Sequence, residues 1–178
     1  MRKSQVAEIL ARRLNVAPGR VQGIVERLTD AGLVTKAVGN TRYPPDIAPS
    51  ETLAMVIAVL ADRGLGNVRT SVAEFAALPA DDGQSFGDWL GSVLAGSIDP
   101  GSLAIGSVIV RHQPAGISVT SSTGHRLFGA PPPDRAVAKA TLVPGRALAA
   151  LALETSGQSP ATADAVIALS RAGAHIRF

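Results

Sequence analysis

Hydrolytic chemistry is the first activity to weigh, because hydroxyl, imidazole and carboxylate groups occur together in one stretch of the chain. Ser121, Ser122, Thr123 and His125 are near neighbours, and Asp134 follows them. A serine hydrolase uses this combination, since a histidine base activates the hydroxyl and a carboxylate orients the histidine. The same residue types are common in hairpins. We expect His125 to be a surface or hairpin residue and not a catalytic one.

Metal and thiol chemistry find little support in the composition. The chain has no cysteine, which excludes disulfides and thiolate metal sites. Its three histidines are His112, His125 and His175, and none has another histidine or a carboxylate three or four residues further on. That spacing would place two metal ligands on one helix face. We expect no metal site, no cofactor and no catalytic residue.

Two further motifs resemble chemical sites only in their spacing. Gly64 and Gly66 lack the Gly-Lys-Ser/Thr ending of a phosphate loop and the third glycine of a dinucleotide site. We expect Gly64 to end a helix. Asp81 and Asp82 are adjacent acids, which a solvated loop explains more simply than a paired-acid site. Enzymatic activity is therefore not expected.

The strongest pattern is a pair of short amphipathic helices about a tight turn. Pro18 suits the first position of the second helix, where a missing N–H costs no hydrogen bond. Gly32 suits the left-handed end of that helix, and an extended segment begins at Leu33. Apolar residues recur at the spacing of one helical face in both helices. They are Val6, Ile9, Leu10 and Leu14, then Val21, Ile24, Val25 and Leu28.

This order of helix, turn, helix and strand resembles the winged helix-turn-helix of MarR-type and related prokaryotic regulators. The resemblance is carried by residues 10–34, which read LARRLNVAPGRVQGIVERLTDAGLV, and covers about residues 4–43. In that family the second helix lies in the major groove of DNA, and a hairpin wing touches the backbone or the minor groove. The resemblance implies a wing here that bears Lys36, Gly39, Asn40 and Arg42.

Residues at the start of the second helix are expected to read bases. Gly19, Arg20, Gln22 and Gly23 should form the outward surface there, opposite the apolar face. Arginine can bond two atoms of guanine and glutamine two atoms of adenine, and each such pairing discriminates by roughly 1–3 kcal/mol. Gly23 has no side chain to hold its backbone away from DNA. These four residues are the predicted base readers.

Six residues are expected to contact the DNA backbone, which positions a protein without specifying a sequence. They are Arg12, Arg13, Arg27, Lys36, Asn40 and Arg42. For Arg12 and Arg13 an ordinary solvated helix face is the alternative. Charge supports a basic reader, because residues 1–45 carry eight bases and three acids, a net of +5. Residues 46–102 carry a net of −6, and the remainder carries +4.

The rest of the chain predicts an α+β fold with an N-terminal winged helix-turn-helix, central α-helices and a C-terminal β-meander with one or two helices. Apolar spacing changes from a period near 3.6 to one near 2 beyond residue 101. Helices are expected at 51–63, capped by Ser50, at 71–78, at 86–94, capped by Ser85, and at 146–154 and 161–172, and strands at 103–112, 117–121, 125–128 and 137–143. The expected domains are 1–45 for DNA binding, 46–100 for helices and oligomerisation, and a β-rich 101–178.

These features predict a sequence-specific protein that binds double-stranded DNA, most simply a prokaryotic or phage transcriptional regulator. A homodimer is expected, because two readers related by a dyad contact two half-sites. The helices between Ser50 and Ser97, which bear Phe75, Phe86 and Trp89, are the first candidates for the dimer contact, although these aromatics are more simply explained as intrachain core. The β-rich part, which could also bind a protein partner, is the second candidate. A DNA-packaging subunit similar to a small terminase, and an anti-defence or architectural DNA-binding protein, are the alternatives. No membrane segment or export signal is visible, so a cytoplasmic location is expected.

Overall fold

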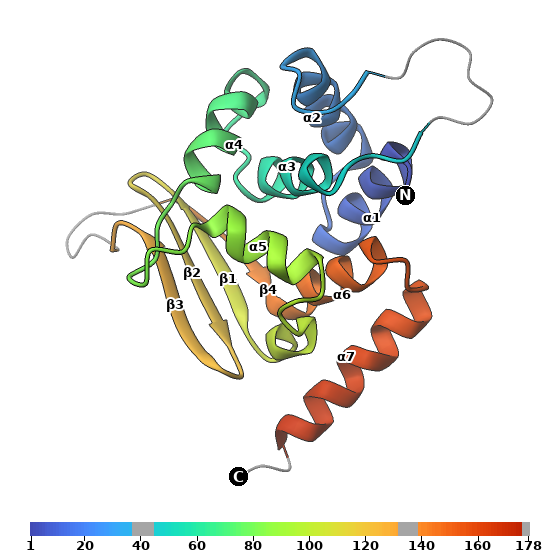
Figure 1. Cartoon of the computed structure of the whole chain (residues 1–178), viewed down its shortest axis with the longest axis vertical. Coiled ribbons are helices and arrows are strands. Elements are labelled where there is room, and N and C mark those ends of the chain that lie inside the picture. The colour runs from blue at the N-terminus through green and yellow to red at the C-terminus, as the bar shows by residue number, and fades with distance from the viewer. Residues whose placement is uncertain (37–44, 132–138, 176–178) are drawn as a thin grey trace.

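The computed structural model describes residues 1–36, 45–131 and 139–175, and it has a mixed α+β fold with helices in the N-terminal half and a sheet in the C-terminal half (Figure 1). The expected wing residues Gly39, Asn40 and Arg42 lie outside the described residues. The described chain opens with three helices that pack on one another. These are α1 (Lys3–Leu14), α2 (Pro18–Asp30) and α3 (Pro49–Leu60).

The turn between α1 and α2 has a simple local cause. Asn15 adopts the left-handed conformation with φ at 53°, a region that asparagine tolerates better than most residues. The N–H of Val16 donates to the carbonyl of Ala11, and Pro18 then opens α2. At the other end of α2, Gly32 has φ at 71°, and the N–H groups of Leu33 and Val34 both donate to the carbonyl of Leu28. The predicted helix, turn and helix are confirmed.

Two helices and two short 3-10 turns connect this bundle to the sheet. The turns are η1 (Leu65–Asn67) and η2 (Pro100–Leu103), and the helices are α4 (Val68–Ala76) and α5 (Phe86–Leu94). Phe86, Trp89 and Phe128 form an aromatic cluster with ring centroids 5.4–5.7 Å apart. Both α5 aromatics and Phe75 are buried inside the chain. The aromatic residues of α4 and α5 therefore belong to the core and offer no aromatic surface for a dimer contact in this part of the described chain.

Four antiparallel strands form one sheet. They are β1 (Ser107–His112), β2 (Ala115–Ser121), β3 (Gly124–Gly129) and β4 (Ala140–Pro144). The expected meander holds for β1 to β3, but the sheet order is β3-β2-β1-β4, so β4 crosses back and pairs with β1. The inner face carries buried apolar side chains that pack toward the helices. On the outer face, the registers align Leu127, Ser118, Ile109 and Leu142 in one row across all four strands.

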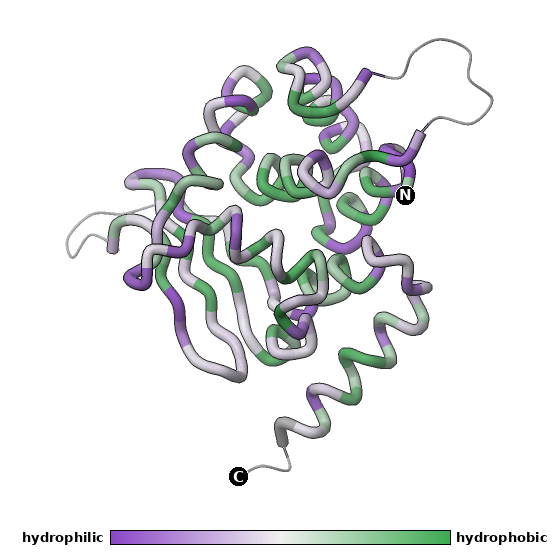
Figure 2. Tube along the Cα trace, viewed as in Figure 1, coloured by the Kyte–Doolittle hydropathy of each residue, from purple (hydrophilic) through white to green (hydrophobic). Residues whose placement is uncertain are grey.

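The last two helices join the sheet to the N-terminal bundle. They are α6 (Gly145–Thr155) and α7 (Pro160–His175). Apolar side chains of α6, such as Leu148 and Leu151, are fully buried, and α6 packs directly on α1. α7 extends away from the body, as Figure 1 shows, and green apolar positions line much of α6 and α3 in Figure 2. The three expected segments therefore share one hydrophobic core, which the sequence did not indicate.

No helix among the described residues is both long and apolar enough to cross a membrane.

Gly145 generates a first prediction, because the chain passes very close to it where β4 turns into α6. A Cβ atom at this position would lie 2.1 Å from the carbonyl oxygen of Leu103 and 2.8 Å from that of Gly106. Backbone atoms cannot yield as a flexible side chain can, so Gly145→Ala should lower the free energy of unfolding by about 1–3 kcal/mol. Urea denaturation followed by circular dichroism measures this.

Gly173→Ala is the control, because that helical glycine has open space around it, so the variant should gain up to about 1 kcal/mol in the free energy of unfolding. Equal effects of the two changes would contradict the close packing at Gly145.

Candidate nucleic-acid interface

The second helix presents two faces of different character. Val21, Ile24, Val25 and Leu28 are buried against α1 and α3, as the apolar spacing predicts. The exposed ridge begins at Gly19 and continues through Gln22 and Glu26 to Asp30. Only the first two turns of α2 therefore expose neutral polar or small residues, whereas the later turns expose carboxylates.

Arg20 is held by an acid from the end of α3. Its Nε and Nη2 atoms donate to the two carboxylate oxygens of Asp62 at 2.7 and 2.6 Å, a bidentate pair. Asp62 also accepts the N–H of Gly64 at 2.9 Å. The hydrogen bond from Arg20 lowers the pKa of Asp62, although partial burial opposes this. Because Arg20 remains 36% exposed, its guanidinium is oriented by Asp62 but still reachable from solvent.

The other three expected base readers differ in position. Gly19 is exposed, with open space where a side chain would stand. Gln22 is exposed, and its amide donates to the carboxylate of Glu26 at 3.2 Å. Gly23 is half-buried and not fully outward as expected, and a Cβ there would meet the side chain of Leu65 in η1 at 3.5 Å, an ordinary van der Waals contact.

Arg12 and Arg13 do not form the open basic surface that the sequence suggests. Both donate to the buried carboxylate of Glu154, which projects from α6. Arg12 makes two bonds at 3.2 and 2.5 Å, and the Nε of Arg13 makes one at 2.5 Å. The Nη1 of Arg13 also donates to Asp164 of α7 at 2.6 Å. The donors of Arg13 are thus used within the protein, whereas 43% of the Arg12 side chain remains exposed.

The charge of Glu154 is stabilised by its partners. Burial alone would raise the pKa of this carboxyl, but hydrogen bonds from Arg12 and Arg13 outweigh it and hold the pKa below its ordinary value. Glu154 was not a predicted site residue. The sequence did contain a signal for its role, because Glu154 is the one acidic residue in a helix that is otherwise rich in alanine and leucine. Such a residue is expected to find a cationic partner when its helix is buried.

The remaining backbone candidates are more open. Arg27 is 58% exposed and lies 3.7 Å from Asp30 across one helical turn, a weak surface pair. Lys36 is exposed at the point where the described chain breaks off before the expected wing. Lys3, which sequence reasoning did not single out, lies beside this region and donates to the carbonyl of Thr35 at 3.2 Å. Among the described residues near α2, the basic side chains of Lys3, Arg27 and Lys36 make no hydrogen bond to a carboxylate that holds them in place.

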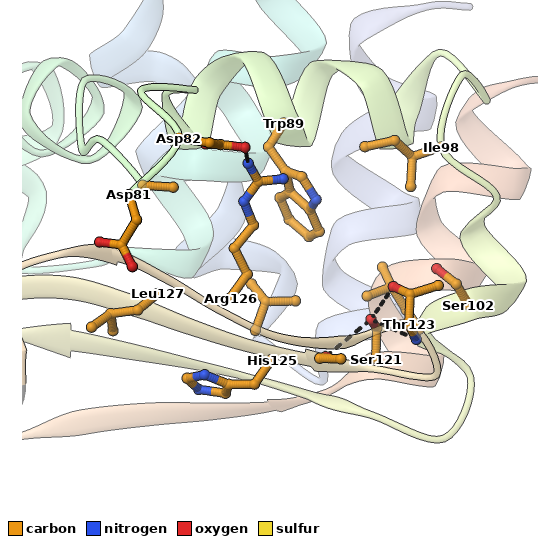
Figure 3. A pocket seen from close by; sticks show the side chains of 14 residues that line it. Asp81, Asp82, Trp89, Ile98, Ser102, Ser121, Thr123, His125, Arg126 and Leu127 are labelled. Carbon is orange, nitrogen blue, oxygen red and sulfur yellow. Dashed lines mark hydrogen bonds and ion pairs between the residues drawn. The ribbon is translucent and has the colours of Figure 1, made fainter.

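A separate half-open cavity of about 450 Å³ lies between α5 and the β2–β3 hairpin (Figure 3). Trp89, Leu103 and Val119 line its apolar part, and Arg126, paired with Asp82, lines its polar part. Figure 3 shows His125 turned to the opposite side of the sheet from Arg126. There the Nε2 of His125 is 2.6 Å from the Oγ of Ser118. The hydroxyl of Ser121 bonds with Thr123 instead, so His125 does not join the serines next to it in sequence.

One further serine has the spacing of a hydrolase nucleophile, within Gly83-Gln84-Ser85-Phe86-Gly87. Its geometry is that of a helix cap. Ser85 has an extended backbone with φ at −75°, and its Oγ accepts the N–H of Asp88 at 3.0 Å. A nucleophile elbow requires a strained turn that projects the hydroxyl from the chain. Ser85 is the N-cap residue of α5, as expected from its position before an apolar helix. Within the described residues, no group of three or more His, Asp or Glu side chains is placed to hold a metal ion.

No protein-family model, curated protein or solved structure matches this chain.

Glu154 generates the second prediction. Glu154→Gln keeps the shape of the side chain but removes the charge that Arg12 and Arg13 share. Arg12 is 43% exposed and Arg13 keeps Asp164, so the free energy of unfolding should fall by about 1.5–3 kcal/mol. Asp164→Asn is the matched control. It breaks an ion pair whose acid is 62% exposed, so it should cost less than about 1 kcal/mol. Urea denaturation of both variants at neutral pH makes the comparison. A loss in Glu154→Gln no larger than that in the control would contradict the account of this carboxylate.

The same carboxylate predicts how stability depends on pH. The folded pKa of Glu154 is lowered, so its contribution is fully present above the unfolded value of about 4.3 and is lost as the pH falls through the folded value. Wild-type protein should therefore lose stability more steeply below about pH 4.3 than Glu154→Gln does. Thermal melts across the acidic range measure this slope. Parallel curves for the two proteins would show that Glu154 does not titrate as described.

Proposed function

We propose that this protein binds double-stranded DNA through the amino-terminal half of α2 and acts as a sequence-specific regulator. The observation that supports this most directly is the start of α2, whose first five residues include the exposed Gly19 and Gln22 and the partly exposed, oriented guanidinium of Arg20. A recognition helix contacts base edges chiefly with its first residues. Glutamine and arginine are suited to adenine and guanine, respectively.

Charge confines the proposed contact to that part of the helix. Glu26 and Asp30 occupy the exposed ridge further along α2, and phosphates would repel both carboxylates. Arg20 lies in the part of α2 that precedes these carboxylates. In the proposed complex its Nε and Nη2 atoms stay bonded to Asp62, and the exposed edge of the guanidinium faces a base. Asp62 then acts as a positioning residue, since it fixes the guanidinium before DNA arrives. Pre-orientation of this kind reduces the entropy lost on binding.

Backbone contacts in this proposal come from Lys3, Arg27 and Lys36. Lys3 and Lys36 line one hollow together with Gln22, Arg27 is exposed further along α2, and Lys36 leads into the segment expected to form a wing. Arg13 is excluded from this role, because Glu154 and Asp164 occupy its donors. Arg12 contributes at most its exposed edge. Few phosphate contacts predict modest non-specific affinity, so base readout has to supply most of the discrimination.

The fourth prediction separates readout from anchoring. A preferred duplex is first selected from random sequences with the full chain, and binding to it and to a scrambled duplex is then measured by fluorescence anisotropy. Gln22→Ala should weaken binding to the preferred duplex by roughly 1–3 kcal/mol and leave the scrambled duplex nearly unchanged. Lys36→Ala should weaken both duplexes alike and reduce the slope of log affinity against log salt by roughly one.

Glu26→Gln serves as the control on the same ridge. It removes a carboxylate that repels phosphate while keeping the partner of Gln22 polar, so affinity for both duplexes should rise. If no duplex is enriched by selection and none is bound at low salt, the proposal fails. If Gln22→Ala and Lys36→Ala act identically on both duplexes, DNA binding stands but the assignment of α2 as the reading helix does not.

A further inference from the structure

The two edges of the sheet are treated differently by the chain. Along the outer edge of β3, the N–H of Gly129 donates to the carbonyl of Pro79, and Ala80 bridges to Phe128. That edge is therefore partly covered by the segment that precedes α5. At the other end of the sheet, β4 pairs with β1 on one side, and no described strand or bridge pairs with its other side. An open edge presents unpaired backbone groups to any strand that fits.

The hydrogen-bonding pattern fixes which groups of β4 are free. The N–H of His112 donates to the carbonyl of Lys139, and the N–H of Gly145 donates to that of Gly106, so these are the hydrogen-bonded pairs at the two ends of the ladder. Bonding alternates along an antiparallel pair. Thr141 and Val143 therefore direct their backbone groups toward β1. Ala140, Leu142 and Pro144 direct theirs outward, and Pro144 has only a carbonyl to offer.

The side chains at this edge are uncharged and, apart from Thr141, apolar. The strand reads Ala-Thr-Leu-Val-Pro, and Leu142 at its centre is 66% exposed. Directly beside it in the register is Ile109 of β1, which is 36% exposed on the same outer face. Proteins usually protect an open edge with charge, a bulge, a proline or a short strand. β4 is short and ends in Pro144, but it carries no charged residue and has an exposed leucine at its centre.

We propose that β4 is the contact through which two copies of this chain form a dimer, with the two strands antiparallel about a dyad at Leu142. In that register Leu142 and the partner's Leu142 exchange two hydrogen bonds, because both direct their N–H and carbonyl outward. Each Ala140 N–H donates to the carbonyl of the partner's Pro144. Because proline has no N–H, the return bond to the carbonyl of Ala140 is the one that each such pair lacks. The two sheets become one continuous sheet across the dyad.

The outer face supports the same register. Opposed residues of an antiparallel pair lie on the same face, so Leu142 and the partner's Leu142 meet directly. Ile109 flanks each of them, which yields an aliphatic row of four side chains across the dyad. No charged residue of β4 opposes its own copy. A second copy therefore covers the largest exposed apolar side chain of the sheet without burying a charge.

Light scattering after size exclusion tests the proposal with the full chain at several protein concentrations. Wild-type protein is expected to approach twice its 18.2 kDa mass as concentration rises. Leu142→Lys places like charges opposite each other at the dyad, so self-association should weaken at least roughly tenfold. Leu169→Lys is the matched control, because Leu169 is equally large and 74% exposed but lies on α7. That variant should dimerise like wild type.

A second measurement locates the contact. Because the chain has no cysteine, Leu142→Cys introduces a single thiol, which a short bis-maleimide should link to its copy, whereas Leu169→Cys should not be linked. Circular dichroism of each variant establishes that it is folded. A wild-type protein that stays monomeric at every concentration overturns the proposal. So does a dimer that persists in Leu142→Lys, or one in which Leu142→Cys is not cross-linked. These outcomes do not depend on DNA binding.

Discussion

The buried carboxylate of Glu154 is the constraint on which much of the arrangement depends. A charge taken out of water must be paired and hydrogen-bonded, and the two guanidinium groups that satisfy Glu154 come from the far end of the sequence, on α1. The pair fixes α1 to α6, and Asp164 extends the link to α7. The N-terminal helices therefore pack with the C-terminal half around one shared hydrophobic core.

The pair of Arg20 and Asp62 repeats this arrangement at the opposite end of the helix pair. It joins the start of α2 to a residue just past the end of α3. With α1 held by Glu154 and α2 held by Asp62, the exposed ridge of α2 has a fixed orientation on the body. A pre-oriented ridge suits recognition that depends on a few residues. Arg12, Arg13 and Arg20 all pair with acids from outside residues 1–45, so these three arginines contribute less free positive charge than the composition of that segment suggests.

Local features of the fold followed from the sequence, and long-range ones did not. Apolar periodicity located both helices of the reader, and the change of period after residue 101 located the sheet, because side chains repeat on one face of a helix or strand with fixed spacing. The partners of Arg12 and Arg20 lie 142 and 42 residues away in the chain, beyond the reach of any spacing rule. For the same reason, the crossing of β4 to β1 and the partial burial of Gly23 could not be predicted. Helical spacing gives the face of a residue but not the element that will cover it.

Hydrogen–deuterium exchange of the full chain, with and without its selected DNA duplex, tests the central claim most directly. A helix end that contacts DNA should exchange its backbone and neighbouring amides more slowly when the duplex is bound. The account predicts slower exchange in peptides from residues 18–26, with no comparable change in peptides from β1 and β2. Slower exchange confined to the sheet or to α7, or no change with the duplex bound, would contradict the assignment of α2 as the DNA-reading element.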